Sequence, residues 1–221
     1  MGGNERMRKI FDEKLAEIHR NLLQFGIMVN RAIYNSVKAF VTKDIHLADE
    51  IIKNDLFINQ KENEIDKKCT EIIALQQPLA SDLRRVIAVI RASSNLERMG
   101  DHAQNIAEAT INLKDEKHIP KLETLFKSMG DKVIQMSADI IDAFVDFNVE
   151  AAREIAMRDE EIDNSYNLFR LTAIDIMKED PSTVFAASDY SFVGRDLERI
   201  GDYITNIAEG IVYLDSCVLQ V

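Results

Sequence analysis

The residues of this chain with the clearest chemical potential are carboxylates that recur in two matching segments. Residues 96–108 read LERMGDHAQNIAE and residues 197–209 read LERIGDYITNIAE. Over the eighteen positions that begin at Leu96 and at Leu197, ten residues are identical, whereas unrelated segments of average composition would share about one. Because a repeat of this kind reflects a duplicated structural unit, the acids that both copies contain are candidates for function.

On an α-helix, residues three and four positions apart lie on one face. The first copy places four oxygen-bearing side chains on such a face, which we call the first acidic strip: Glu97, Asp101, Asn105 and Glu108. The second copy repeats it as the second acidic strip: Glu198, Asp202, Asn206 and Glu209. Like charges four positions apart destabilise a helix by a few tenths of a kcal/mol, so both copies contain an arrangement that is unfavourable without a counter-charge.

A fainter repeat of acids lies about forty residues before each strip. Here Asp55 and Asn59 match Asp159 and Asp163. If these residues face the strips, four or more oxygen ligands converge, a set suited to hard or borderline cations such as Mg²⁺, Ca²⁺, Mn²⁺ or iron. We therefore predict two metal sites, the first cluster and the second cluster, formed respectively by Asp55, Asn59, Glu97 and Asp101 and by Asp159, Asp163, Glu198 and Asp202.

The two halves are not identical around these residues. Glu62 and Asp66 extend the first set, whereas Tyr166 and Arg170 occupy the equivalent places in the second. Acidic pairs are also common on solvated helix faces, and Arg98 and Arg199 can simply pair with neighbouring carboxylates. Gly100 and Gly201 sit within the strips, where glycine destabilises a helix by about 1 kcal/mol relative to alanine. We expect them to permit close packing against another helix.

The elements that must position these residues are long helices. Apolar residues recur every three or four positions, Asp44 and Asn148 are suited to capping helices, and Pro78 and Asp180-Pro181 interrupt the pattern. With 8 Gly and 3 Pro in 221 residues, the chain lacks the turns that an all-β fold needs. The pattern predicts six helices over about 5–42, 44–75, 79–113, 121–147, 148–178 and 181–214.

Helices of this length need partners along their whole extent. The polar stretch KDEKHIP at 114–120 is the best candidate for a boundary between domains. The sequence therefore predicts an all-α fold of two tandem antiparallel three-helix bundles related by duplication, with residues 1–115 in the first and 116–221 in the second.

Composition excludes several classes of function. A net charge of −11 argues against direct binding of nucleic acid. Two isolated cysteines, Cys69 and Cys217, exclude a thiolate zinc site and fit a reducing cytosol, with Cys69 expected in the core. No signal peptide and no membrane-spanning segment are recognisable. Because phosphate-binding loops, dinucleotide fingerprints and nucleophile motifs are lacking as well, we expect no enzyme.

The doubled LER-[MI]-G-D-x-x-x-N-I-A-E, together with Gln76-Gln77-Pro78-Leu79-Ala80-Ser81-Asp82-Leu83-Arg84, resembles the PhoU family over nearly the whole chain. The second repeat departs from this pattern, because Asp180-Pro181-Ser182-Thr183 stands where the QQPLASDLR segment would be. The QQPLASDLR segment therefore belongs to the first half alone.

The resemblance implies a cytoplasmic regulator of phosphate homeostasis, a negative regulator of phosphate uptake and of the phosphate-starvation response. It implies an adaptor between the ATPase subunit of the phosphate ABC transporter and the membrane sensor histidine kinase, often as a homodimer. It also implies metal ions (iron, zinc, manganese or magnesium) held by E(D)-x-x-x-D(N) motifs, which match the eight residues of the two clusters. The alternatives are a metal-storage or metal-chaperone protein without a signalling role, and a helical scaffold with solvated strips.

Overall fold

Capping residues and prolines divide the chain into helices close to those expected. The computed structural model describes the backbone of residues 2–218 and the side chains of residues 8–215, and contains no strand within that range. Asp44 caps α2 by accepting a hydrogen bond from the backbone N–H of Leu47 at 3.0 Å, and Asn148 caps α5 in the same way. The helices are α1 (Gly2–Thr42), α2 (Ile45–Gln76), α3 (Ala80–Asn112), α4 (Pro120–Val145), α5 (Val149–Met157), α6 (Asp159–Glu179) and α7 (Val184–Val218).

The expected fifth helix is in fact two, because the chain turns at Arg158. Arg158 donates a backbone hydrogen bond to Ile155 three residues back, and its guanidinium pairs with Asp139 of α4. The three acids Asp159, Glu160 and Glu161 then form the first turn of α6, where negative charge favours a helix N-terminus. A short 3₁₀ turn, η1 (Pro181–Thr183), also precedes α7, so the last helix begins later than expected.

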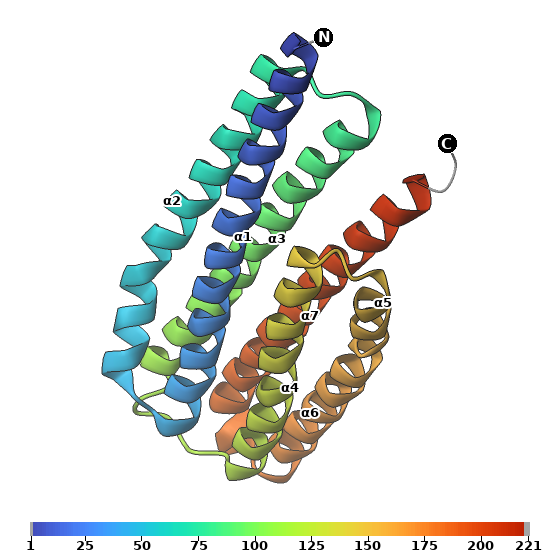
Figure 1. Cartoon of the computed structure of the whole chain (residues 1–221). Coiled ribbons are helices and arrows are strands. Elements are labelled where there is room, and N and C mark those ends of the chain that lie inside the picture. Colours follow the sequence, from blue (N-terminus) through green and yellow to red (C-terminus); the bar gives the residue numbers. More distant parts are fainter. Residues whose placement is uncertain (1, 219–221) are drawn as a thin grey trace.

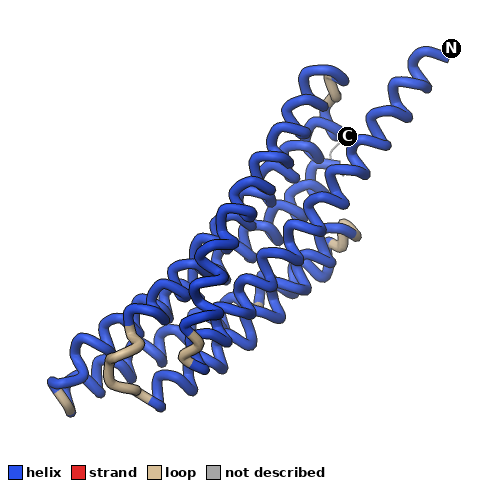
Figure 2. Tube along the Cα trace, turned by 90° about the vertical axis from the view of Figure 1, so that its left-hand side faces the viewer, coloured by secondary structure: helices blue, strands red, loops and turns tan. Residues whose placement is uncertain are grey.

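The helices are arranged in four parallel layers across the molecule. α1 and α3 pack against α4 and α7 in the centre, α2 covers the first pair, and α5 with α6 covers the second (Figure 1). All of them run along one long axis of the molecule (Figure 2). Each half is thus a three-helix bundle, as expected, in which α5 and α6 together take the place of one outer helix in the second half. The sequence repeat lies in an inner helix, α3 or α7. The expected boundary at residues 115 and 116 falls in the loop between α3 and α4.

A continuous apolar core runs through both halves. It includes Phe25 and Phe40 of α1, Met99 of α3, Phe126 of α4 and Phe169 of α6, all of them almost inaccessible to solvent. Cys69 is buried in the same core, as expected, and burial raises the pKa of its thiol to about 12. Cys217 lies outside the described side chains. No described helix has the length and apolarity required to cross a bilayer.

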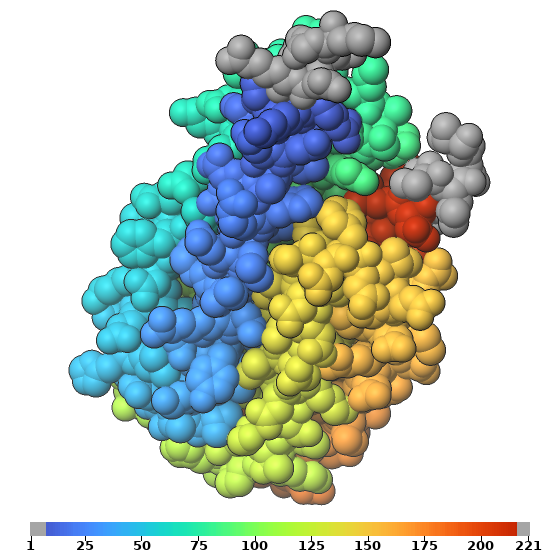
Figure 3. Space-filling view, viewed as in Figure 1, coloured from blue at the N-terminus to red at the C-terminus, as the bar shows by residue number. Residues whose placement is uncertain are grey.

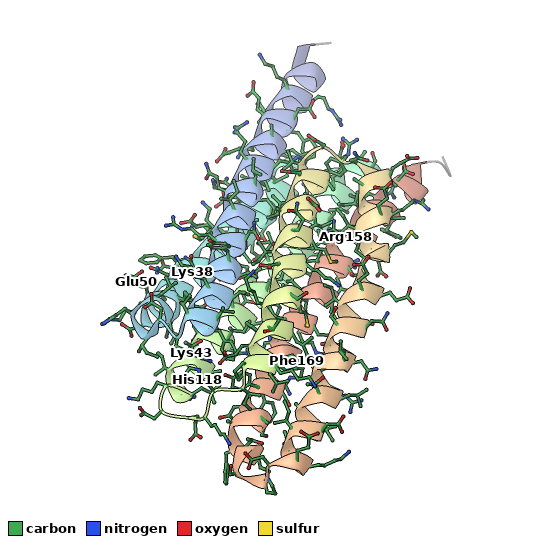
Figure 4. The ribbon with its side chains drawn as sticks, turned by 90° about the horizontal axis from the view of Figure 1, so that it is seen from below. Lys38, Lys43, Glu50, His118, Arg158 and Phe169 are labelled. Atoms are coloured by element: carbon green, nitrogen blue, oxygen red, sulfur yellow. The ribbon has the colours of Figure 1, made fainter. Side chains whose placement is uncertain are left out.

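A polar network, which the sequence pattern does not reveal, joins the two halves at one end. Lys43, just after α1, donates to the hydroxyl of Tyr190 in α7 at 2.9 Å, and that hydroxyl donates to Glu123 of α4 at 2.6 Å. Lys43 also lies 3.1 Å from Glu123. His118 lies 3.2 Å from Glu123 and close to Lys43 (Figure 4). Although burial opposes the effect, the hydrogen bonds from Tyr190, Lys43 and His118 lower the pKa of Glu123.

Candidate metal sites

The two acidic strips lie along the seams between an outer and an inner helix. The α2–α3 seam contains the first cluster and the α6–α7 seam contains the second. The apolar face of each strip helix points the other way, with Leu96, Met99 and Ile106 of α3 buried. The side chains of Glu97, Asp101, Glu198 and Asp202 are half-buried, whereas the later strip residues Asn105, Glu108, Asn206 and Glu209 are exposed.

Both strip glycines lie where the helices of a seam approach closely. A Cβ on Gly100 would stand 2.9 Å from Ile58 Cγ2 of α2. A Cβ on Gly201 would stand 3.3 Å from both Asp159 Oδ1 and Ile162 Cγ2 of α6. The expectation that these glycines permit close packing is confirmed, and the packing brings the acids of the outer helices toward the strips.

The four residues of the first cluster lie along the α2–α3 seam, but its three carboxylates are not gathered within 4.8 Å of one another as three of the second cluster are. Asp55 is 8% exposed and accepts a hydrogen bond from Asn59 Nδ2 at 2.9 Å through Oδ2. Burial and the nearby charge of Asp101 raise the pKa of Asp55, and burial and Asp101 likewise raise the pKa of Glu97. Asp55 also contributes to the shift of Glu97, so the carboxylates of α2 and α3 share one electrostatic environment.

The second cluster is more tightly gathered and more acidic. One carboxylate oxygen from each of Asp163, Glu198 and Asp202 lies within 4.8 Å of the others. Burial and the charges of Asp163 and Asp202 raise the pKa of Asp159, so this carboxylate shares the electrostatic environment of the other three. Burial and Asp202 similarly raise the pKa of Glu198. The greater acidity follows from Asp163, which stands where the first cluster has Asn59.

Each cluster also contains a buried carboxylate oxygen without a protein hydrogen-bond donor. Within the described part of the chain, Oδ1 of Asp55 and Oδ1 of Asp159 are inaccessible to solvent and have no partner at hydrogen-bonding geometry, although the Thr205 hydroxyl lies near enough to Asp159 to lower its pKa. An unpaired buried polar atom is unfavourable by about 1–3 kcal/mol, and these two atoms occupy equivalent positions in the two halves. A cation bound at each seam would satisfy both, so the residues present fit the metal that the fold family implies.

The strip arginines neutralise only part of this charge. Arg199 donates to Asp202 at 3.1 Å and lies 3.8 Å from Glu198, whereas Arg98 lies 3.8 Å from Glu97. Both arginine side chains are more than half exposed, where ion pairs contribute about 0–1 kcal/mol. The pKa values of Glu97 and Glu198 stay raised despite these arginines.

His102, which directly follows Asp101 of the first strip, has a partner that sequence reasoning missed. Its Nδ1 lies 2.9 Å from Oδ1 of Asp196, a residue of α7 that is 4% exposed, and its ring stacks on Tyr203. His102 therefore belongs to the α3–α7 contact rather than to the metal clusters. The 101-residue offset of the repeat aligns His102 with Tyr203, so the two rings hold equivalent positions in the two inner helices, which pack against each other.

Comparison with known proteins identifies the architecture. The model of the PhoU domain matches this chain twice, over residues 22–110 and 126–211. The chain belongs to the PhoU family. The two matched segments each span most of one bundle and contain one acidic strip, which agrees with the internal repeat.

Relatives in the PhoU family extend over nearly the full chain. A phosphate-specific transport system accessory protein PhoU homolog of Clostridium acetobutylicum is 39% identical over 94% of this chain and 94% of its own. One from Streptococcus pneumoniae is 38% identical over 95% of this chain and 97% of its own. The crystal structure of PhoU from Pseudomonas aeruginosa superposes with a TM-score of 0.90 at 33% identity, covering 93% of this chain and 99% of that one.

Proposed function

We propose that this protein is a regulatory accessory protein of a phosphate-specific transport system that acts by binding rather than by catalysis. The support is membership of the PhoU family and relatives at 38–39% identity named for that role. The residues with perturbed pKa values in the two clusters are carboxylates along helix seams, an arrangement suited to holding cations.

The proposed role is negative regulation of phosphate uptake and of the phosphate-starvation response in the cytoplasm. In this role the protein bridges the ATPase subunit of the phosphate transporter and the membrane sensor histidine kinase, and it forms a homodimer. The crystal structure of the Streptococcus pneumoniae relative, described as a phosphate transport system regulatory protein, covers 93% of this chain with a TM-score of 0.87. That likeness supports a regulatory rather than a transporting role.

Metal binding at both seams is the second part of the proposal, and the unpaired Oδ1 atoms of Asp55 and Asp159 are the observation that carries it. The ligands would be Asp55, Asn59, Glu97 and Asp101 in one half and Asp159, Asp163, Glu198 and Asp202 in the other, and the ion would be iron, zinc, manganese or magnesium. A bound cation supplies positive charge. The carboxylates would then hold an outer helix against an inner one, which stabilises each bundle for partner binding.

A deletion strain tests the regulatory role. We expect loss of the gene to raise phosphate uptake and the expression of starvation-induced phosphatase in phosphate-rich medium, with the intact gene on a plasmid restoring repression. The alternative, metal storage or a metal chaperone, predicts instead normal phosphate uptake with altered cellular iron, zinc or manganese. Normal repression in the deletion strain would refute the proposed regulatory function.

A further inference from the structure

A groove that the metal clusters do not use lies between the first half of α3 and the last part of α7. It encloses about 620 Å³, a volume in the range of ligand and peptide sites. Its floor is apolar, formed by the buried side chains of Phe144, Ile207 and Leu214. In Figure 3 the red surface of α7 lies beside the green surface of α3 at this end of the molecule. Two lining residues, Ile87 at 37% and Tyr213 at 57% exposure, show that the groove is open to solvent.

The two walls of the groove have opposite charge. Arg84 and Arg91 stand on the α3 wall with Ile87 between them, and Glu209 stands on the α7 wall. Neither arginine has an ion pair or hydrogen bond with any described side chain. In a chain of net charge −11, two such arginines on one helical face are available to an acidic partner, because guanidinium groups are suited to binding carboxylates.

Gly210 supplies an independent observation that the groove receives a ligand. It lies within α7 and lines the groove, and a Cβ at this position would meet nothing within 4 Å. The other helical glycines described in this way each have a close neighbour. Glycine destabilises a helix by about 1 kcal/mol relative to alanine, so packing among the residues that the structure describes does not account for Gly210, whereas a partner close to the α7 backbone does.

The arginine wall is specific to the first half of the chain. At the 101-residue offset that aligns the strips, Arg84 corresponds to Phe185 and Arg91 to Phe192. The duplicated chain thus has the acidic strips in both halves and this charged apolar wall in one. A feature that the fold itself required would be expected in both copies, so the difference supports a single binding site.

The geometry points to a docking site for an amphipathic acidic helix of a partner protein. Arg84 and Arg91 are seven residues apart, about 10.5 Å along the helix axis. A helix lying along α3 would meet them with two carboxylates at the same spacing and would cover Ile87, which is 37% exposed, with apolar residues between. Its acidic edge would face α3, since Glu209 on the opposite wall repels it. This is the helix-in-groove mode of recognition.

The site rests on the proposed function only in that it requires the protein to act by binding partners. A fluorescein-labelled 21-residue helical peptide serves as the probe, with glutamates at positions i and i+7 and leucines at i+3 and i+4. We expect saturable binding in fluorescence anisotropy. Lysines in place of the two glutamates should weaken it at least tenfold, as should the variant Arg84→Glu/Arg91→Glu, and that variant should bind the lysine peptide better than the wild type does.

Two further variants complete the test. Arg85→Glu alters an exposed neighbour on α3 outside the groove and should leave binding within twofold, whereas Gly210→Leu should block it. Circular dichroism checks that every variant is folded. Absence of saturable binding, equal binding of both peptides, or equal loss on Arg85→Glu would overturn the inference. So would a wild-type dimer that Gly210→Leu converts to a monomer, because the occupant would then be a second copy. None of these readouts depends on phosphate repression, so failure here is distinct from failure of the proposed function.

Discussion

The carboxylates of the two seams are unfavourably placed in the absence of a cation. Burial and like charges raise the pKa values of Asp55, Glu97, Asp159 and Glu198. A raised pKa means that the folded protein favours the protonated form, so ionisation at neutral pH lowers stability. The same charges favour a bound cation, and protons compete with that cation as the pH falls toward the carboxyl range.

This balance predicts that removing one such charge stabilises the chelator-treated protein. We expect Asp159→Asn to raise the free energy of unfolding in urea at pH 7 by about 0.5 kcal/mol, since relief from burial and from repulsion by Asp163 and Asp202 outweighs the lost favourable charge at the N-terminus of α6. Asp131→Asn is the matched control, because Asp131 is exposed and pairs with Lys127. A metal-free Asp159→Asn protein less stable than the wild type would show that the second cluster is not electrostatically strained.

At the scale of the helices, three glycines predict three different responses to the same substitution. Gly100→Ala should destabilise the protein by about 1–3 kcal/mol, because the new Cβ would lie 2.9 Å from Ile58 Cγ2. Gly201→Ala should leave the stability nearly unchanged. The new Cβ would lie 3.3 Å from its nearest neighbours, and the gain in helix propensity offsets the unfavourable effect of these close contacts. Gly210→Ala should stabilise by up to about 1 kcal/mol. Thermal unfolding of the three variants checks this order, and a stabilising Gly100→Ala would contradict the packing described.

Most helix ends were predictable because local residues determine them. Asp44 and Asn148 cap where expected, and Pro78 ends α2. The break at Arg158 was missed, although the run Asp159-Glu160-Glu161 is a signal for a helix start. At the equivalent positions the first half has Asp55-Leu56-Phe57, and α2 continues through them without a break. The eight cluster residues could be proposed from the sequence because both copies of the repeat have the helical spacing. The contact between Asp196 and His102 was not predicted, because it joins two residues that lie 94 positions apart on different inner helices.

At the scale of the whole molecule, the two halves are joined by polar contacts as well as by the shared core. His102 and Asp196 connect α3 with α7, and the network around Glu123 connects the end of α1 with α4 and α7. Buried polar groups of this kind are strongly destabilising when one partner is removed. The network therefore contributes to the fixed orientation of the two bundles.

This network predicts a specific dependence of stability on pH. The pKa of Glu123 is lowered from 4.5, so its ionised form stabilises the fold above that pH, and the stabilisation is lost as the pH falls through the lower, folded-state value. We expect Glu123→Gln to be less stable than the wild type at pH 7, with the difference narrowing below pH 4.5. Urea unfolding of both proteins across this range measures it. A difference that stays constant or widens on acidification would mean that Glu123 is not stabilised in its charged form.

The most direct test of the central claim, that each seam holds metal, is the metal content of the protein. The wild type is purified without chelators, dialysed against iron, manganese or zinc, and analysed by inductively coupled plasma mass spectrometry. A variant with Asp159→Asn, Asp163→Asn, Glu198→Gln and Asp202→Asn is treated in parallel, with its helicity checked by circular dichroism. The account predicts stoichiometric metal in the wild type and loss of only the second cluster's share in the folded variant. A wild type without stoichiometric metal, or a variant with unchanged content, would contradict it.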